Sequence, residues 1–290
     1  MKRIFAVILT LACLFGLVAC ETNTSATTAK PKPTAAELKE KSSLSYVLSV
    51  CDGLLVTERM IGESYKTTTY FTKSDNGLIM SSTNMVDGEI NDAALMMNGA
   101  VYQTIDTNFA FGIITGEDES VYASWDDHYG LPDLTDADPT VTYEGDTATL
   151  AVTVTDEYDD ILTYTYCANA TTLRPISMTI ESKDKEGTVH ETTELTYTYP
   201  TDYSVDTTVY DAITGAKDAI TLTVIIDPKG TATTRTYTVS ASCYIMATGM
   251  SDTFYAVYSD SDCTEVIYDL SWVTGNSATI YVAPYEFTIE

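Results

Sequence analysis

The 290-residue sequence predicts a mainly β protein with one large antiparallel sheet, one N-terminal helix and a small second β domain. Three observations predict this fold class. Tyrosine occurs 21 times beside abundant Thr and Val, the side chains that fit a pleated, half-buried surface. From residue 54 onward, apolar and polar residues alternate with a period of two. Turn signals such as Asn76-Gly77 and Asn98-Gly99 separate the alternating segments.

The first twenty residues have the pattern of a secretory signal. Lys2 and Arg3 precede an apolar stretch at residues 4–18, which is shorter than the ~20 residues that a membrane-spanning helix needs. The stretch ends in Leu17-Val18-Ala19-Cys20, which resembles the lipobox of bacterial lipoprotein signal peptides. The resemblance implies cleavage before Cys20 and attachment of palmitate-type lipid to it. The alternative is an ordinary secretory signal with a chance cysteine.

We therefore expect the protein on the outer face of the cytoplasmic membrane or at the cell surface, in a Gram-positive bacterium. Several acyl chains on one residue suffice for stable anchoring, so Cys20 would join the protein to the membrane. Residues 21–33 are rich in Thr, Ser, Ala and Lys and lack an apolar period, which predicts a disordered tether.

One helix is predicted after the tether. Thr34 and Glu37 stand at the spacing of a capping box and predict a helix over residues 35–50, which Asp52-Gly53 ends.

The large sheet is predicted from alternating segments between residues 54 and 199. The clearest segments span residues 66–73, 78–85, 94–97, 100–105, 109–114, 140–144, 149–155, 162–167, 176–180 and 195–199. Leu150, Val152 and Val154 alternate with Ala and Thr, so we expect one apolar face and one face rich in Thr.

Residues 115–139 interrupt the alternation with Gly, Pro and many acidic residues, and they also contain Trp125, His128 and Tyr129. A loop of this length inside a β domain is usually functional or disordered. We therefore expect these three side chains to belong to a lid over the apolar sheet face.

A second block of strands follows a boundary near residues 207–216. Its segments span residues 219–226, 233–242, 254–258 and 279–282. The expected organisation is a signal at 1–20, a tether at 21–33, a β domain at 34–210 and a small β domain at 211–290.

The apolar face of the large sheet requires a cover, because an apolar sheet face must be buried against another layer. With one clear helix available, the sheet must curl on itself or stay partly open. A curled sheet with a loop at its mouth can leave an apolar cavity for a hydrophobic ligand. The alternative is an interior that side chains fill completely.

The first β domain resembles the LolA-like class of lipoprotein carriers, which includes the LppX-type mycobacterial lipoproteins. The resemblance rests on the lipobox, the helix at 35–50, the segment 164–176 with its Leu173-Arg174-Pro175, and the last strand at 193–199. It implies an antiparallel half-barrel preceded by a helix, and binding or carriage of acyl chains inside it.

The last block is similar to the bacterial repeats found on surface proteins of Gram-positive bacteria. Residues 255–264 and 273–282 carry the similarity, although a single copy is present and the usual glycine-rich opening is absent. The resemblance implies a small β-grasp-like domain.

The charge balance excludes some partners. The chain has 15 Lys and Arg against 42 Asp and Glu, a net charge of −27. Nucleic acid is excluded because phosphate contacts need a basic face, and broad adhesion to anionic lipid headgroups is disfavoured. A hydrophobic ligand and the membrane anchor remain as partners, and protein partners stay unknown.

Four cysteines remain outside the signal and the anchor. Outside the cytoplasm they could form two disulfides, for which proximity in sequence favours Cys243–Cys263 and leaves Cys51–Cys167. The alternative is four reduced, partly buried thiols.

No residue pattern predicts catalysis, a metal site or a cofactor. The two histidines, His128 and His190, lack a third catalytic partner in the sequence. The acidic stretches at 133–138 and 156–160 do not match a calcium loop. We expect a non-enzymatic lipoprotein that binds a hydrophobic, acyl-chain ligand, and the alternative is a cell-surface interaction or spacer protein with a filled barrel.

Overall fold

The computed structural model describes residues 32–75, 77–105, 108–115, 129–135, 137–156, 158–248 and 254–285. Contacts divide the chain into two units, residues 1–31 and residues 32–290. The predicted signal, Cys20 and nearly all of the tether lie outside the described residues. Within the described part, no helix is long and apolar enough to cross a membrane.

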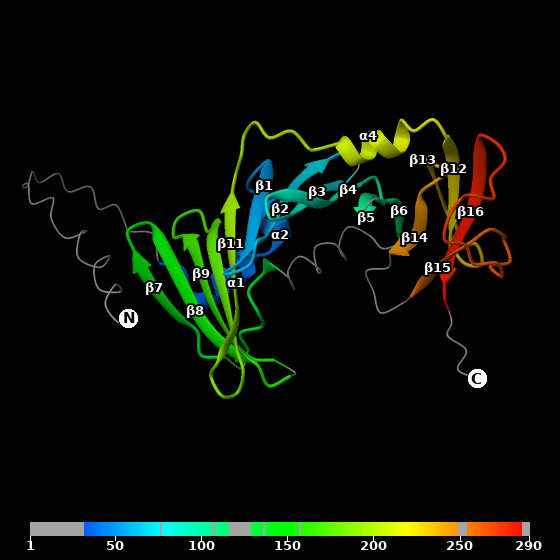
Figure 1. The fold of residues 1–290 in the computed structure, drawn as a ribbon. Helices are drawn as coiled ribbons and strands as arrows, with labels where there is room; N and C mark the ends of the chain where they lie inside the picture. The colour runs from blue at the N-terminus through cyan, green and yellow to red at the C-terminus, as the bar shows by residue number, and fades with distance from the viewer. Residues whose placement is uncertain are drawn as a thin grey trace, which may run out of the picture. The chain divides into compact units, whose positions relative to one another are not determined.

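The largest element of the described chain is a sheet of 12 strands in the order β14-β6-β5-β4-β3-β2-β1-β11-β10-β9-β8-β7 (Figure 1). In chain order its strands are β1 (Gly53–Met60), β2 (Tyr65–Ser74), β3 (Gly77–Val86), β4 (Glu89–Met97), β5 (Ala100–Ile105), β6 (Asn108–Ile114), β7 (Thr140–Glu144), β8 (Thr147–Thr155), β9 (Ile161–Asn169), β10 (Pro175–Lys183), β11 (Val189–Thr198) and β14 (Tyr244–Thr248). The sheet is antiparallel except where β14 runs parallel to β6. Because β7 and β14 are the two edges, the sheet is open. The predicted fold class, mainly β with an open, curved antiparallel sheet, is confirmed.

The predicted helix begins as expected but is divided in two, α1 (Ala35–Lys41) and α2 (Leu44–Val47). The capping box is present, since Thr34 Oγ1 accepts from Glu37 N at 3.2 Å and Glu37 Oε2 accepts from Thr34 N at 2.7 Å. Ser42 and Ser43 interrupt the helix. Ser42 Oγ donates to the carbonyl of Lys39 at 2.8 Å and Ser43 Oγ accepts from Tyr46 N at 3.3 Å, so the two hydroxyls end one helix and cap the next.

The Asn98-Gly99 signal forms a turn where the sequence predicts it, whereas Asn76 lies outside the described residues. Asn98 and Gly99 have φ angles of 54° and 72°, and they connect Met97 directly to its cross-strand partner Ala100. Two consecutive positive φ angles are the geometry of a type I′ hairpin turn, which fixes the register of β4 against β5.

One face of the large sheet, here called the inner face, packs against the two helices. Leu38, Leu44 and Val47 are fully buried against it. The inner core also contains Leu54, Val56, Phe71, Leu78, Met96, Ile114, Leu131, Leu150, Val152, Tyr166, Met178, Leu195 and Tyr197. The apolar half of each predicted alternation thus faces the helices.

The opposite, outer face is buried at β4 to β6 by the C-terminal part of the chain. Leu95, Tyr102, Phe111 and Ile113 share a core with Ile213 and with residues of the second sheet. Strand β6 is therefore buried on both faces, which explains its continuous apolar run.

The C-terminal part forms a second sheet of four strands in the order β13-β12-β16-β15. Its elements are α4 (Thr208–Thr214), β12 (Ala219–Ile226), β13 (Thr233–Ser240), β15 (Tyr255–Tyr258) and β16 (Ser277–Pro284). Strands β12 and β16 are parallel, and the outer pairs are antiparallel.

Two features were not expected, one at the predicted boundary and one within the second block. The short helix α4 occupies most of residues 207–216. Strand β14 leaves the second block and joins the large sheet. The division into domains at 34–210 and 211–290, and the bacterial-repeat assignment, stay predictions.

Candidate functional site

An apolar strip extends along the inner face beside the buried core. Cross-strand register places Val152 opposite Tyr164, Tyr164 opposite Ile180, and Ile180 opposite Thr193. Val152 is 3% exposed, whereas Tyr164, Ile180 and the neighbouring Val154 are only partly buried. Burial, and then the charge of Asp156, raise the pKa of Tyr164 above its ordinary value.

A polar region lies on the same face over β1 to β3. Thr67 and Thr69 are 8% and 3% exposed. Thr67 Oγ1 donates to Tyr65 Oη at 2.8 Å, and the hydroxyls of Thr69 and Ser82 are 3.0 Å apart. Glu58 lies opposite Thr67 on β1. The inner face therefore offers apolar and polar contacts within one surface.

The sequence did not indicate this polar region. Its signal is the run Thr67-Thr68-Thr69, in which the alternation of apolar and polar residues is lost. Consecutive residues of a strand point to opposite faces of the sheet. A run of consecutive threonines therefore places hydroxyls on both faces, including the face that is otherwise apolar.

The predicted lid is described only from Tyr129 onward, and Trp125 and His128 lie outside the described residues. Tyr197 Oη donates to the carbonyl of Tyr129 at 2.9 Å. Leu131 is 1% exposed in the inner core, and Lys39 Nζ donates to its carbonyl. The described part of the segment is thus packed on the inner face beside α1.

Tyr129 is the one predicted lid side chain that the structure places. Burial, and then the negative charge of Glu58, raise the pKa of Tyr129 to about 12. Its side chain therefore contacts the polar region of the inner face in its neutral form.

One buried polar atom in the inner core has no hydrogen-bond partner among the described residues. This atom is the hydroxyl oxygen of Tyr166, a residue that is 1% exposed. Burial is the largest of the effects that raise the pKa of Tyr166 well above its ordinary value. A buried hydroxyl without a hydrogen-bond partner lowers stability by about 1–3 kcal/mol. A polar group bound beside Tyr166 would therefore be favoured.

The four cysteines outside the signal are free thiols in the structure, and neither Cys51–Cys167 nor Cys243–Cys263 is bonded. Each thiol has a local contact instead. Cys51 Sγ donates to the carbonyl of Val47 at 3.0 Å, and Cys167 Sγ lies 3.5 Å from Thr149 Oγ1. Cys243 is fully buried in the outer core, and Cys263 Sγ lies 3.9 Å from the carbonyl of Ser261 in a turn.

His190 and the acidic stretches have structural surroundings. His190 Nε2 is 3.6 Å from Asp184 at an exposed position. Asp133 accepts from Thr135 at 2.7 Å, which is the first cause of its lowered pKa. Asp156 accepts from the backbone N–H of Tyr158 at 2.9 Å. Over the ranges that the structure describes, no three His, Cys, Asp or Glu residues gather as a metal site.

Comparison with known proteins finds similarity to solved structures only at low sequence identity. No family model and no curated protein matches the sequence. One similar structure is that of the lipoprotein LppX of Mycobacterium tuberculosis. The alignment covers 60% of this chain and 100% of the LppX chain, with 11% identity and a TM-score of 0.38. A second is the structure of MucB in complex with MucA(peri). The alignment covers 58% of this chain and 57% of the MucB chain, with 8% identity and a TM-score of 0.36.

A LolA superfamily protein from Nitrosomonas europaea aligns with 59% of this chain over 96% of its own. Its identity is 13% and its TM-score is 0.25. All three TM-scores are below 0.5, so these similarities transfer no function to this chain, which spans little more than half of MucB.

Proposed function

We propose that this chain is a lipid-anchored extracytoplasmic protein that binds a hydrophobic ligand, with an acyl chain, on the inner face of its large sheet. The observation that carries the proposal is the strip of Val154, Tyr164 and Ile180. These side chains continue the buried inner core but remain partly accessible. Small-molecule sites are concave, mostly apolar surfaces with a few polar groups.

The ligand is amphiphilic in this proposal. Register continues from Ile180 through Thr193 to Met60, and Glu58 is the next inner-face residue along β1. An acyl chain on the apolar strip would therefore bring its polar end toward the hydroxyls and carboxylate over β1 and β2. Residues 115–139, which contain Trp125, His128 and Tyr129, would act as the lid.

The location follows from the N-terminal sequence. The lipobox-like Leu17-Val18-Ala19-Cys20 and the polar tether support anchoring at the outer face of the cytoplasmic membrane or the cell surface, in a Gram-positive bacterium. Replacement of Cys20 by Ser should abolish incorporation of labelled palmitate and release the protein from the membrane fraction. Unchanged labelling of this variant would contradict the anchor.

A second function is a non-catalytic spacer or interaction protein. The specific observation in its favour is the filling of the inner face beside the helices, where Leu38, Leu44 and Leu131 are at most 1% exposed. In this case the partly buried strip is the margin of a packed core. Neither function requires catalysis, and we propose none.

Mass spectrometry of lipid that co-purifies with the protein distinguishes the two functions. The form that begins at residue 21 should retain an acyl lipid after purification without detergent. The variant Ile180→Asn should lose it, because a polar amide replaces an apolar wall of the strip.

Ile176→Asn is the matched control, since Ile176 lies on the same strand but is 40% exposed. It should retain the lipid. A folded protein that carries no lipid and displaces no apolar fluorophore would contradict ligand binding.

A further inference from the structure

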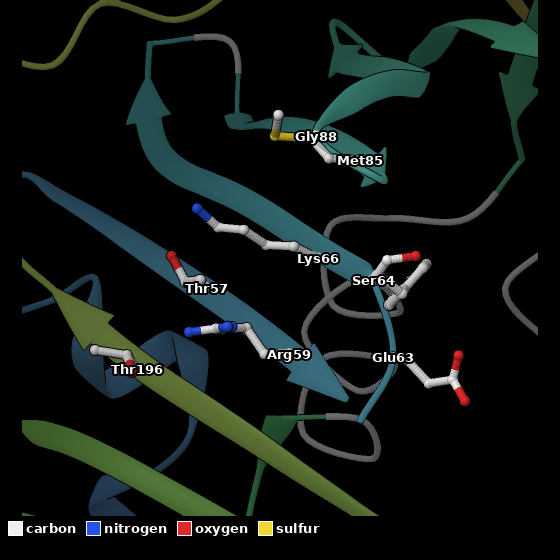
Figure 2. A pocket seen from close by; sticks show the side chains of 9 residues that line it. Thr57, Arg59, Glu63, Ser64, Lys66, Met85, Gly88 and Thr196 are labelled. Carbon is white, nitrogen blue, oxygen red and sulfur yellow. The ribbon is translucent and has the colours of Figure 1, made fainter. Parts of the chain in front are cut away.

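The outer face carries a pocket that is distinct from the inner strip. It has a volume of about 570 Å³ and lies over β1, β2 and β11 (Figure 2). Thr57, Arg59 and Lys66 are among its lining residues. They alternate along their strands with the inner-face residues Glu58 and Thr67, so the pocket opens on the opposite side of the sheet.

Two positively charged side chains line this pocket. Arg59 is directly opposite Lys66 in the register of β1 and β2. Like charges at directly opposite positions destabilise a sheet. No ion pair of the described residues includes either side chain. Two adjacent positive charges are unusual in a chain with a net charge of −27. An anion bound between Arg59 and Lys66 would reduce the repulsion between them.

The two side chains extend to the same side of the pocket. Figure 2 shows Arg59 and Lys66 extending in the same direction along their strands, toward Thr57. Thr196 of β11 and Ser64 of the turn after β1 add two further hydroxyls to the lining. Guanidinium, ammonium and hydroxyl groups are all hydrogen-bond donors.

The nearby acidic groups of the described chain form no ion pair with Arg59 or Lys66. Glu63 lines the pocket, but its carboxylate points away from Arg59 and Lys66 in Figure 2. Glu194 is opposite Arg59 on β11, and it is exposed and forms no ion pair with a described residue. Glu58 faces the inner side.

We propose that this pocket binds a phosphate group. Arg59 presents a planar fork that matches two phosphate oxygens, and Lys66 supplies a compact charge beside it. Thr57, Ser64 and Thr196 can donate to the remaining oxygens. The phosphate is either free inorganic phosphate or the phosphodiester of a lipid headgroup, and its binding is independent of acyl binding on the inner face.

Calorimetric titration of the full chain in neutral detergent micelles tests the proposal. The two titrants are inorganic phosphate and glycerophosphoglycerol, the soluble phosphodiester headgroup of phosphatidylglycerol. Wild-type protein should show saturable binding of one or both. Tighter binding of inorganic phosphate identifies the free ion, and tighter binding of the diester identifies a headgroup.

The variants Arg59→Gln and Lys66→Gln should each weaken binding about tenfold, because each removes a charge-assisted hydrogen bond. Lys185→Gln is the matched control, since it changes the net charge equally at an exposed turn position, and it should bind as wild type. No saturable binding to wild type, or an equal loss in Lys185→Gln, overturns the proposal.

Thermal melting gives a second measurement that does not depend on the titration. Without phosphate, Arg59→Gln should melt no lower than wild type, because it removes the repulsion from Lys66. Phosphate should raise the melting temperature of wild type and leave that of the double variant Arg59→Gln/Lys66→Gln unchanged. An equal increase in both proteins overturns the site.

Discussion

The hydroxyl of Tyr197 donates a hydrogen bond of 2.9 Å to the backbone carbonyl of Tyr129, which is 68 residues earlier in the chain. Tyr197 is 5% exposed, and burial raises its pKa above the ordinary value, so the hydroxyl stays protonated at neutral pH. This bond joins the described end of the lid segment to the last antiparallel strand of the inner face.

Replacement of Tyr197 by Phe should lower the free energy of unfolding by about 1–3 kcal/mol, because the Tyr129 carbonyl loses its donor in a partly buried position. Urea denaturation measures the change. Tyr158→Phe is the control, since Tyr158 is 78% exposed, and it should change stability by less than about 0.5 kcal/mol. Equal stability of the two variants would contradict a structural role for the bond.

Stability should fall as the pH rises from about 10 to about 12. The pKa of Tyr129 is raised to about 12 by burial and by Glu58, above its unfolded value near 10. Between these values the unfolded chain releases a proton that the folded chain retains, so the unfolded state is favoured. Urea denaturation at each pH and tyrosinate absorbance measure the effect. Tyr129→Phe should reduce the slope but not remove it, because burial also raises the pKa values of Tyr164, Tyr166 and Tyr197. If the free energy of unfolding depends on pH in this variant as it does in wild type, the loss of stability comes from other tyrosines.

Arg235 should stabilise the contact between the second sheet and the large sheet. Its Nη1 donates to the carbonyls of Ile114 at 2.8 Å and Gly99 at 3.2 Å. Arg235→Met retains the apolar stem but removes both bonds, and we expect a loss of about 1.5–3 kcal/mol in the free energy of unfolding. Lys217→Met, at an exposed position, is the control and should unfold as wild type.

The thiols should differ in reactivity when they are reduced. Cys243 is fully buried, and burial raises its pKa to about 11, so it should react last with a disulfide reagent. Cys263 is partly exposed in a turn and should react before it. Titration after unfolding of the form that begins at residue 21 counts four thiols in reduced protein, and none if Cys51–Cys167 and Cys243–Cys263 both form. Early labelling of Cys243 would contradict its burial.

The sequence correctly predicted features that depend only on residues close together in the chain. The Thr34 and Glu37 capping box and the Asn98-Gly99 turn each depend on a few neighbouring residues, and the structure contains both. The break at Ser42 and Ser43 was missed, because helical periodicity continues across the two serines while their hydroxyls bond to the backbone.

Features that depend on distant pairing could not be predicted in this way. Strand β14 is short, and only its pairing with β6 defines it as part of the large sheet. Arg59 and Lys66 are seven positions apart, and they become neighbours through the turn around Gly62. A search for like charges placed symmetrically about that turn would have found the pair. The anchor at Cys20 stays a prediction from the lipobox resemblance.

The pairing of Tyr244 with Ala110 has a consequence for the order of events during synthesis. Strand β6 can acquire its outer neighbour only after residues 244–248 have emerged. Until then the nascent chain exposes a row of unpaired backbone N–H and C=O groups on an apolar strand, a template for association with another chain. Completion of the sheet is therefore a late step in biogenesis, and a chain truncated before residue 244 should aggregate although its helices and first eleven sheet strands are encoded.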